Sequence, residues 1–181
     1  GTLLAAQLGM RTIFGGHEAE GTLDRAVATL RAATRGVTYL HWPDADQAGH
    51  AWGWTSPHYR AAARRLDAAM ARLLDVSGVL HDPRAVLIAL ADHGGGGQRH
   101  DDHDSTHPHD VTIPIMMAGG QVRRGELPGG SSPIDVCATI PWLFGIAPPS
   151  GWSGRPRAMS VPLAAPYSQY CLPSAFNVRR G

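Results

Sequence analysis

The stretch Val86-Leu-Ile-Ala-Leu-Ala-Asp-His-Gly-Gly95 joins a continuous apolar run to a polar, glycine-rich segment. A short apolar run such as Val86–Leu90 predicts a strand that is buried on both faces. Asp92 and His93 follow this strand at its carboxyl end. In open parallel α/β sheets, functional groups collect in the loops at that end of the strands. We therefore expect Asp92 and His93 to belong to a functional site.

On both sides of this stretch, predicted strands alternate with predicted helices. The further strands are Arg11–Phe14, Val37–Leu40 and Val111–Met117. The helices run from an N-cap at Thr22 to about Ala33, from Ser56-Pro57 to about Leu74, and from Ser132-Pro133 to about Phe144. Residues 41–55 are predicted as a loop. This alternation predicts an α/β layer structure with a mostly parallel sheet.

Composition narrows the possible classes of protein. The 181 residues, 43% of them apolar, are enough for one domain with a sizeable core. A net charge of +1 gives no indication of nucleic-acid binding, and no apolar stretch is long enough to span a membrane. All 16 basic residues are arginine, which excludes a Schiff-base lysine and a P-loop lysine. The two cysteines form no CxxC pair, so a cysteine-rich zinc site is excluded.

A second site segment follows the predicted strand Val37–Leu40. Asp46 and His50 lie four residues apart there, and we expect Gly49 to turn the backbone so that both side chains face one point. Oxygen and nitrogen ligands together suit zinc, manganese or iron. Two such metals would form a clamp for phosphoryl transfer, so the residues point to a phosphate ester as substrate.

Several residues admit two interpretations. The histidines between residues 93 and 109 form either a metal site or a low-complexity surface loop. Asp44 is interpreted as a loop carboxylate rather than a ligand. The tryptophans at 42, 52 and 54 either stack on a substrate or pack their own loop onto the fold. We favour the packing role.

Three blocks in fixed order carry a resemblance to a known family. They are Pro43-Asp-Ala-Asp-Gln-Ala-Gly-His50, Ala91-Asp-His-Gly-Gly95, and a histidine before Thr112-Ile-Pro114. Together they resemble the alkaline phosphatase superfamily, in its type I phosphodiesterase/nucleotide pyrophosphatase branch. Asp135–Pro149 and Gly154-Arg-Pro156 resemble later motifs of the same family.

The resemblance implies a three-layer α/β/α sandwich, truncated here. It would place residues 1–156 in the C-terminal part of such a domain and residues 157–181 in an irregular Pro-rich tail. It also implies two divalent metals, most often zinc, and a small phosphate ester as substrate. The metal ligands carried over by position are Asp46, His50, Asp92, His93 and His103.

Within that set, the resemblance assigns Asp46, His50 and His103 to one metal, and Asp92 and His93 to the other. His103 fits the family's spacing before the Thr-Ile-Pro strand best, and His100 is the alternative. The family's nucleophile, a Thr or Ser, would lie upstream of Gly1, so we expect little turnover by this chain alone. Two alternatives stay open: a non-catalytic metal-binding remnant, and a sulfatase-like or phosphomutase-like member.

Overall fold

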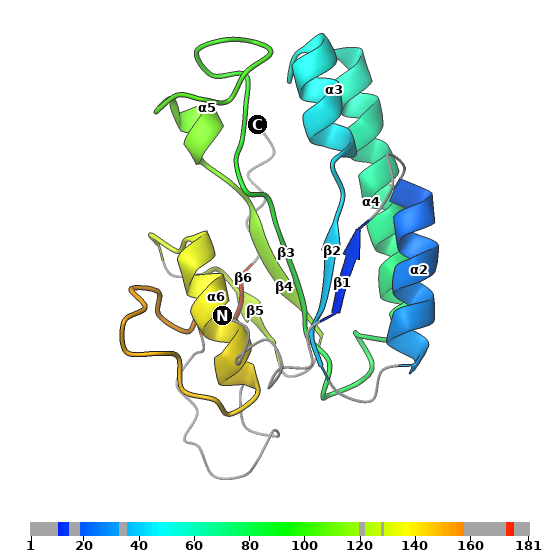
Figure 1. The fold of residues 1–181 in the computed structure, drawn as a ribbon, viewed down its shortest axis with the longest axis vertical. Helices are drawn as coiled ribbons and strands as arrows, with labels where there is room; N and C mark the ends of the chain where they lie inside the picture. The colour runs from blue at the N-terminus through cyan, green and yellow to red at the C-terminus, as the bar shows by residue number, and fades with distance from the viewer. Residues whose placement is uncertain are drawn as a thin grey trace. The chain divides into compact units, whose positions relative to one another are not determined.

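A computed structural model describes most of the chain, in six segments. Its residues are 11–14, 19–32, 36–119, 122–127, 129–157 and 173–175. They fall into two compact units (Figure 1). The first unit takes its residues from Gly1–Ser77 and His93–Thr112, and the second from Gly78–Asp92 and Ile113–Gly181.

The first unit opens with a βαβ element. Strand β1 (Arg11–Phe14) pairs in parallel with β2 (Thr38–His41), and helix α2 (Ala19–Ala32) connects them. The prediction of these three elements is confirmed. The prediction that Thr22 is the N-cap is wrong, because the helix begins three residues earlier. Thr22 is instead fully buried, beside Leu23.

Helix α3 (Asp44–Trp52) replaces the predicted loop. Asp44 and Asp46 lie in its first turn, where carboxylates interact favourably with the helix dipole. Gly49 therefore lies inside a helix and makes no turn, which corrects our expectation. Helical geometry still puts Asp46 and His50 on one face, because residues four apart are neighbours on the helix surface.

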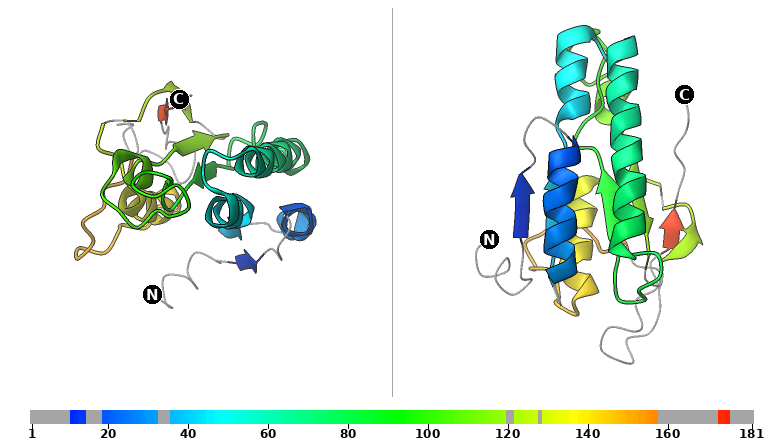
Figure 2. Two further views of the ribbon diagram at one scale, coloured as in Figure 1. Left: turned by 90° about the horizontal axis from the view of Figure 1, so that it is seen from above. Right: turned by 90° about the vertical axis from the view of Figure 1, so that its right-hand side faces the viewer.

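Helix α4 (Pro57–Ser77) contacts both α2 and α3 and runs alongside them (Figure 2). Its N-terminus is as predicted, since Ser56 Oγ accepts a hydrogen bond of 3.0 Å from the backbone N–H of Tyr59. Ala62, Ala69 and Leu73 form its buried face. No helix in the described part of the chain is both long and apolar enough to cross a membrane.

The segment from His93 to Thr112 folds back on itself. The N–H of Gly94 donates to the carbonyl of Asp110 at 2.7 Å, which closes the segment near its ends. Helix α5 (Pro108–Val111) occupies the start of the predicted strand Val111–Met117. A proline at the first position of α5 favours the helix there, so the strand begins only at Ile115.

The second unit is a mixed α/β arrangement. Strand β3 (Leu87–Leu90) pairs antiparallel with β4 (Ile115–Ala118), and β5 (Arg123–Gly125) pairs in parallel with β6 (Pro173–Ala175). Met117 is buried, but Leu90 is 40% exposed, so the prediction that β3 is buried on both faces is wrong. The antiparallel partner also differs from the parallel pairing that we expected for this strand.

Helix α6 (Pro133–Leu143) follows as predicted, and Asp135 in its first turn is 5% exposed. The carboxylate accepts hydrogen bonds from the backbone N–H groups of Ser132 and Arg155, at 3.0 and 2.8 Å, and from the Arg157 guanidinium at 2.9 and 2.6 Å. Burial alone would raise the pKa of Asp135, but these hydrogen bonds outweigh it and lower the pKa. The carboxylate thereby holds the segment 154–157 against the start of α6.

Candidate metal centre

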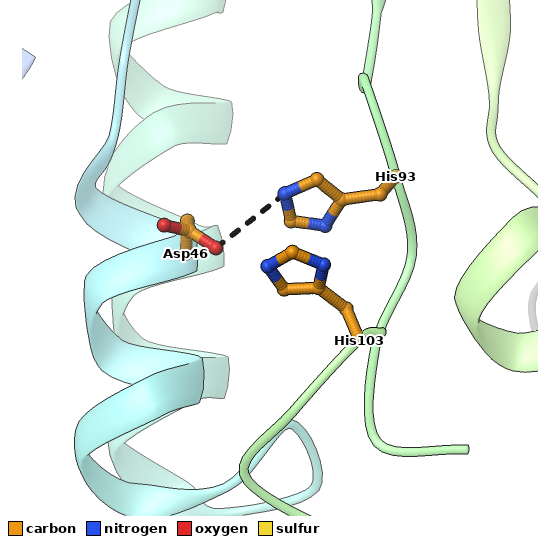
Figure 3. A group of neighbouring side chains, drawn as sticks. All are labelled: Asp46, His93 and His103. Carbon is orange, nitrogen blue, oxygen red and sulfur yellow. Dashed lines mark ion pairs between the residues drawn. The ribbon is translucent and has the colours of Figure 1, made fainter. Parts of the chain in front are cut away.

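Asp46, His93 and His103 come together within the first unit (Figure 3). Each offers one ligand atom, and these atoms lie within 4.8 Å of one another. Asp46 projects from α3, whereas both histidines project from the folded segment between residues 93 and 112 (Figure 3). A carboxylate and two imidazoles at this spacing could hold a divalent cation.

The histidine rings present their Nε2 atoms to the carboxylate of Asp46. Nε2 of His50 lies 3.5 Å from Oδ1 of Asp46, and Nε2 of His93 lies 3.7 Å from the same oxygen. Both distances exceed the 2.7–2.9 Å or so of a charge-assisted N–H···O bond. Two ligands of one tetrahedral zinc would lie about 3.3–3.6 Å apart, given Zn–N and Zn–O distances of about 2.0–2.2 Å. The observed spacing therefore resembles a ligand pair more closely than a direct ion pair.

Hydrogen bonds at Nδ1 fix the orientation of two of these rings. Nδ1 of His93 lies 2.8 Å from the carbonyl oxygen of Gly94, and Nδ1 of His50 lies 3.0 Å from that of Asp101. A carbonyl only accepts, so we assign the ring hydrogen to Nδ1 in both residues. The lone pair then resides on Nε2, which is the form that binds metal.

His103 has an outer partner of a different kind. Its Nδ1 lies 3.4 Å from the Asp104 carboxylate, which favours a hydrogen on Nδ1 and a lone pair on Nε2. The His93 and His103 rings are stacked, with centroids 3.6 Å apart and planes 14° apart.

Oδ1 of Asp46 is the polar atom that most directly requires a partner. It is buried, and no residue that the structure describes gives it a hydrogen bond. A buried carboxylate oxygen without a partner costs folding free energy. A cation beside the Nε2 atoms would satisfy this oxygen, so the residues present fit a divalent metal.

The remaining predicted ligands differ in position. His50 lies next to the cluster, with its ring centroid 5.0 Å from that of His103. Asp92 is exposed and belongs to the second unit, so its role stays a prediction. The His100 side chain is 79% exposed, and that residue uses its carbonyl to accept a 2.9 Å hydrogen bond from the Trp54 N–H.

The loop that carries His103 is held by Asp110, which sequence reasoning passed over. The Asp110 carboxylate accepts a hydrogen bond from the Ser105 hydroxyl and one of 2.8 Å from the Gly97 N–H. The Ser105 bond is the largest cause of a lowered pKa at Asp110; burial opposes it. The His107-Pro108 pair, an N-cap followed by proline at N1, was the available signal that the chain is ordered here.

Two aromatic side chains lie near the cluster: Trp54, which we expected to pack its loop onto the fold, and Tyr59, which sequence patterns did not indicate as a site component. The Trp54 ring meets those of His50, His93 and His103, and Tyr59 lies beside Trp54 with centroids 6.1 Å apart. Burial, and then the negative charge of Asp46, raise the pKa of Tyr59. The Tyr59 hydroxyl therefore stays protonated at neutral pH.

A family model for type I phosphodiesterase/nucleotide pyrophosphatase matches residues 7–114, more than half of the chain. The chain therefore belongs to this family, as its resemblance predicted. The match includes both segments that form the cluster. A search of the curated proteins finds no match.

Among solved structures, the chain is similar to a phosphoglycerate mutase from Leishmania mexicana, crystallised at low cobalt concentration. The two are 16% identical with a TM-score of 0.50, and the similarity covers 76% of this chain. It covers 27% of the mutase, so the chain spans about a quarter of that protein's length. At this identity the similarity concerns the fold alone, and it agrees with a mixed α/β architecture.

Proposed function

We propose that this chain provides the metal-binding part of a hydrolase that acts on phosphate esters. The observation that carries the proposal is the buried Oδ1 of Asp46 facing histidine Nε2 atoms at 3.5 and 3.7 Å. Membership of the phosphodiesterase family supports the same chemistry. The ligands would be Asp46, His50, Asp92, His93 and His103.

We propose that the site binds two metal ions and that both are zinc. The oxygen and nitrogen donors suit zinc. The His93 and His103 rings lie side by side, so each could bind one of two neighbouring ions. Two-metal phosphoryl-transfer sites have separations of about 3.5–4 Å. When bound, such ions would neutralise charge on the phosphoryl oxygens and polarise the attacking oxygen.

A cavity beside His103 supports a small-molecule substrate. It is a pocket open to solvent, with a volume of about 580 Å³, lined by residues with polar side chains: Gln98, His103, Asp104, Ser105, Thr106 and His107. Amide, hydroxyl and imidazole groups can hydrogen-bond the oxygens of an ester. We propose that part of the phosphate ester lies there.

For the architecture, we propose that residues 1–156 form the C-terminal part of a three-layer α/β/α sandwich with a mostly parallel sheet. Residues 157–181 would form an irregular tail. The parallel pair β1–β2 supports this arrangement, and the antiparallel pair β3–β4 is an exception to it. The short strand β6 lies within the tail.

Zinc-dependent binding of inorganic phosphate tests the function. The zinc-loaded chain should bind phosphate in calorimetry, and neither the metal-free chain nor the His103→Ala variant should do so. Zinc binding without phosphate binding would favour a metal-binding remnant. A chain that binds no zinc would contradict both the hydrolase and the metal-binding remnant.

A further inference from the structure

Trp54 lies at the centre of the segments that carry the metal cluster. Its indole ring approaches the His50 ring edge-on with centroids 5.1 Å apart, the His103 ring at 5.8 Å and the His93 ring at 6.5 Å. The interplanar angles are 84°, 72° and 61°, so the three contacts share one edge-to-face geometry. One rigid side chain therefore borders three imidazoles that come from different segments.

Two glycines make room for this indole. A Cβ at Gly49, inside α3, would lie 2.6 Å from the six-membered ring of Trp54. A Cβ at Gly95, in the segment after β3, would overlap the same indole. Glycine inside a helix costs about 1 kcal/mol relative to alanine, so Gly49 has no advantage to α3 itself. Its benefit is the close approach of Trp54 to the backbone.

The backbone of Trp54 is held as well. Its N–H donates a 2.9 Å hydrogen bond to the carbonyl of His100, in the loop that carries His103. Trp54 thus connects the end of α3 with both parts of the folded segment. A ring with only two side-chain torsions, packed between two glycines, has little freedom to move.

We propose that Trp54 is a positioning residue for the metal centre, one that sets the orientation of the His50, His93 and His103 rings. This inference rests on the proposed function, because it deepens the account of the same site. Trp54 touches no predicted ligand atom through a hydrogen bond; it acts by limiting the rotation of the rings. The edge-to-face contacts hold the planes of the rings. The Nδ1 hydrogen bonds of His50 and His93 then direct Nε2 toward Asp46.

The neighbouring tryptophan differs and provides a control. Trp52 is 60% exposed and stacks on His58, with centroids 4.4 Å apart and planes 20° apart. His58 is not among the predicted ligands. A change at Trp52 therefore removes a tryptophan from the same turn without altering the surroundings of the cluster.

The test measures zinc affinity and the visible absorption spectrum of the cobalt-loaded chain, for Trp54→Ala, Trp54→Phe and Trp52→Phe. The cobalt spectrum reports coordination geometry, which a general loss of stability would not change. Outer-shell partners of metal ligands contribute about 10–100-fold to affinity. Trp54→Ala should weaken zinc affinity by an amount in that range and alter the cobalt spectrum. Trp54→Phe should recover most of the affinity and of the spectrum. Trp52→Phe should match the wild type in both measurements.

A second perturbation keeps the proposal testable if Trp54→Ala fails to fold. Gly95→Ala should displace the indole from the other side and produce the same direction of change in the cobalt spectrum. Wild-type affinity and spectrum in a folded Trp54→Ala or Gly95→Ala chain would overturn the role of Trp54 and leave the metal centre standing. Absence of metal binding by the wild type would instead overturn the proposed function, and with it this inference.

Discussion

Asp46 in α3 and Asp135 in α6 occupy similar places, since each lies in the first turn of its helix and has a buried carboxylate oxygen. Their surroundings are opposite. Asp135 accepts hydrogen bonds from two backbone N–H groups and the Arg157 guanidinium. Asp46 Oδ1 has no hydrogen bond in the described part of the chain and faces histidine nitrogens that carry lone pairs. The first carboxylate is satisfied by the chain, and the second is the one beside which we propose that a cation binds.

This contrast separates two uses of an aspartate that has a buried carboxylate oxygen. A satisfied carboxylate stabilises the fold, because removing it leaves donors without partners. A buried carboxylate oxygen that accepts no hydrogen bond lowers the free energy of unfolding, and a bound ligand can offset that loss. Variants at Asp135 should therefore lower the stability and leave metal binding unaffected. Variants around Asp46 should weaken metal binding without lowering the stability.

The largest effect is expected at the cluster. His103→Ala removes a proposed ligand, so zinc affinity should fall by more than the roughly 10–100-fold that loss of an outer-shell partner causes. Isothermal titration calorimetry measures it. The matched control is His100→Ala, in the same loop but with a side chain that is 79% exposed. If His100→Ala weakened binding more than His103→Ala, the assignment of the late histidine would be wrong.

Asp135→Ala should lower the free energy of unfolding by about 2–4 kcal/mol. Breaking a fully buried ion pair costs about 3–5 kcal/mol, and Arg157, at 22% side-chain exposure, can partly reach water. Urea unfolding measures the change. Asp82→Ala, which breaks the exposed pair with Arg84, is the control and should change the free energy of unfolding much less. Equal losses in the two variants would remove the distinction between the pairs.

The pH dependence of stability tests the lowered pKa of Asp135. The pKa of Asp135 is lowered in the folded chain, so its contribution is present above the unfolded-state value of about 3.9 and is lost as pH falls through the folded-state pKa. The stability difference between wild type and Asp135→Asn should shrink below about pH 4. Urea unfolding from pH 7 to pH 3 measures it. A difference that grew on acidification would contradict the lowered pKa.

The smallest effect is expected at Asp104. Its carboxylate lies 3.4 Å from Nδ1 of His103 but is 83% exposed, so water can replace much of its influence. Asp104→Asn should weaken zinc binding by no more than about 10-fold, the lower end for an outer-shell partner. Competition with a chelator of known affinity measures this. An effect as large as that of His103→Ala would mean that Asp104 is itself a ligand.

Sequence patterns predicted the βαβ element from its apolar periodicity and α6 from its cap at Ser132, followed by proline. Helix α3 was missed, since Asp44–Trp52 has no apolar stripe and is held by its contact with α4. The pair of Asp46 and His50 was found for a partly wrong reason. Gly49 makes no turn, and helical spacing brings the two side chains together.

The role of Trp54 could not be predicted, because it depends on the approach of residues 93–97 to the end of α3. The residues next to Trp54 in the sequence give no indication of that contact. Similarly, the loop from Gln98 to Asp110 has the composition of a solvated segment. Asp110 orders it only through partners that tertiary folding brings to it.

X-ray absorption at the zinc edge of the zinc-loaded chain tests the central claim most directly. The account predicts a first shell of nitrogen and oxygen at about 2.0–2.2 Å with imidazole scattering. That scattering should be lost when His50, His93 and His103 are replaced together by alanine. A sulfur shell at about 2.3 Å, or an unchanged spectrum in the triple variant, would contradict it.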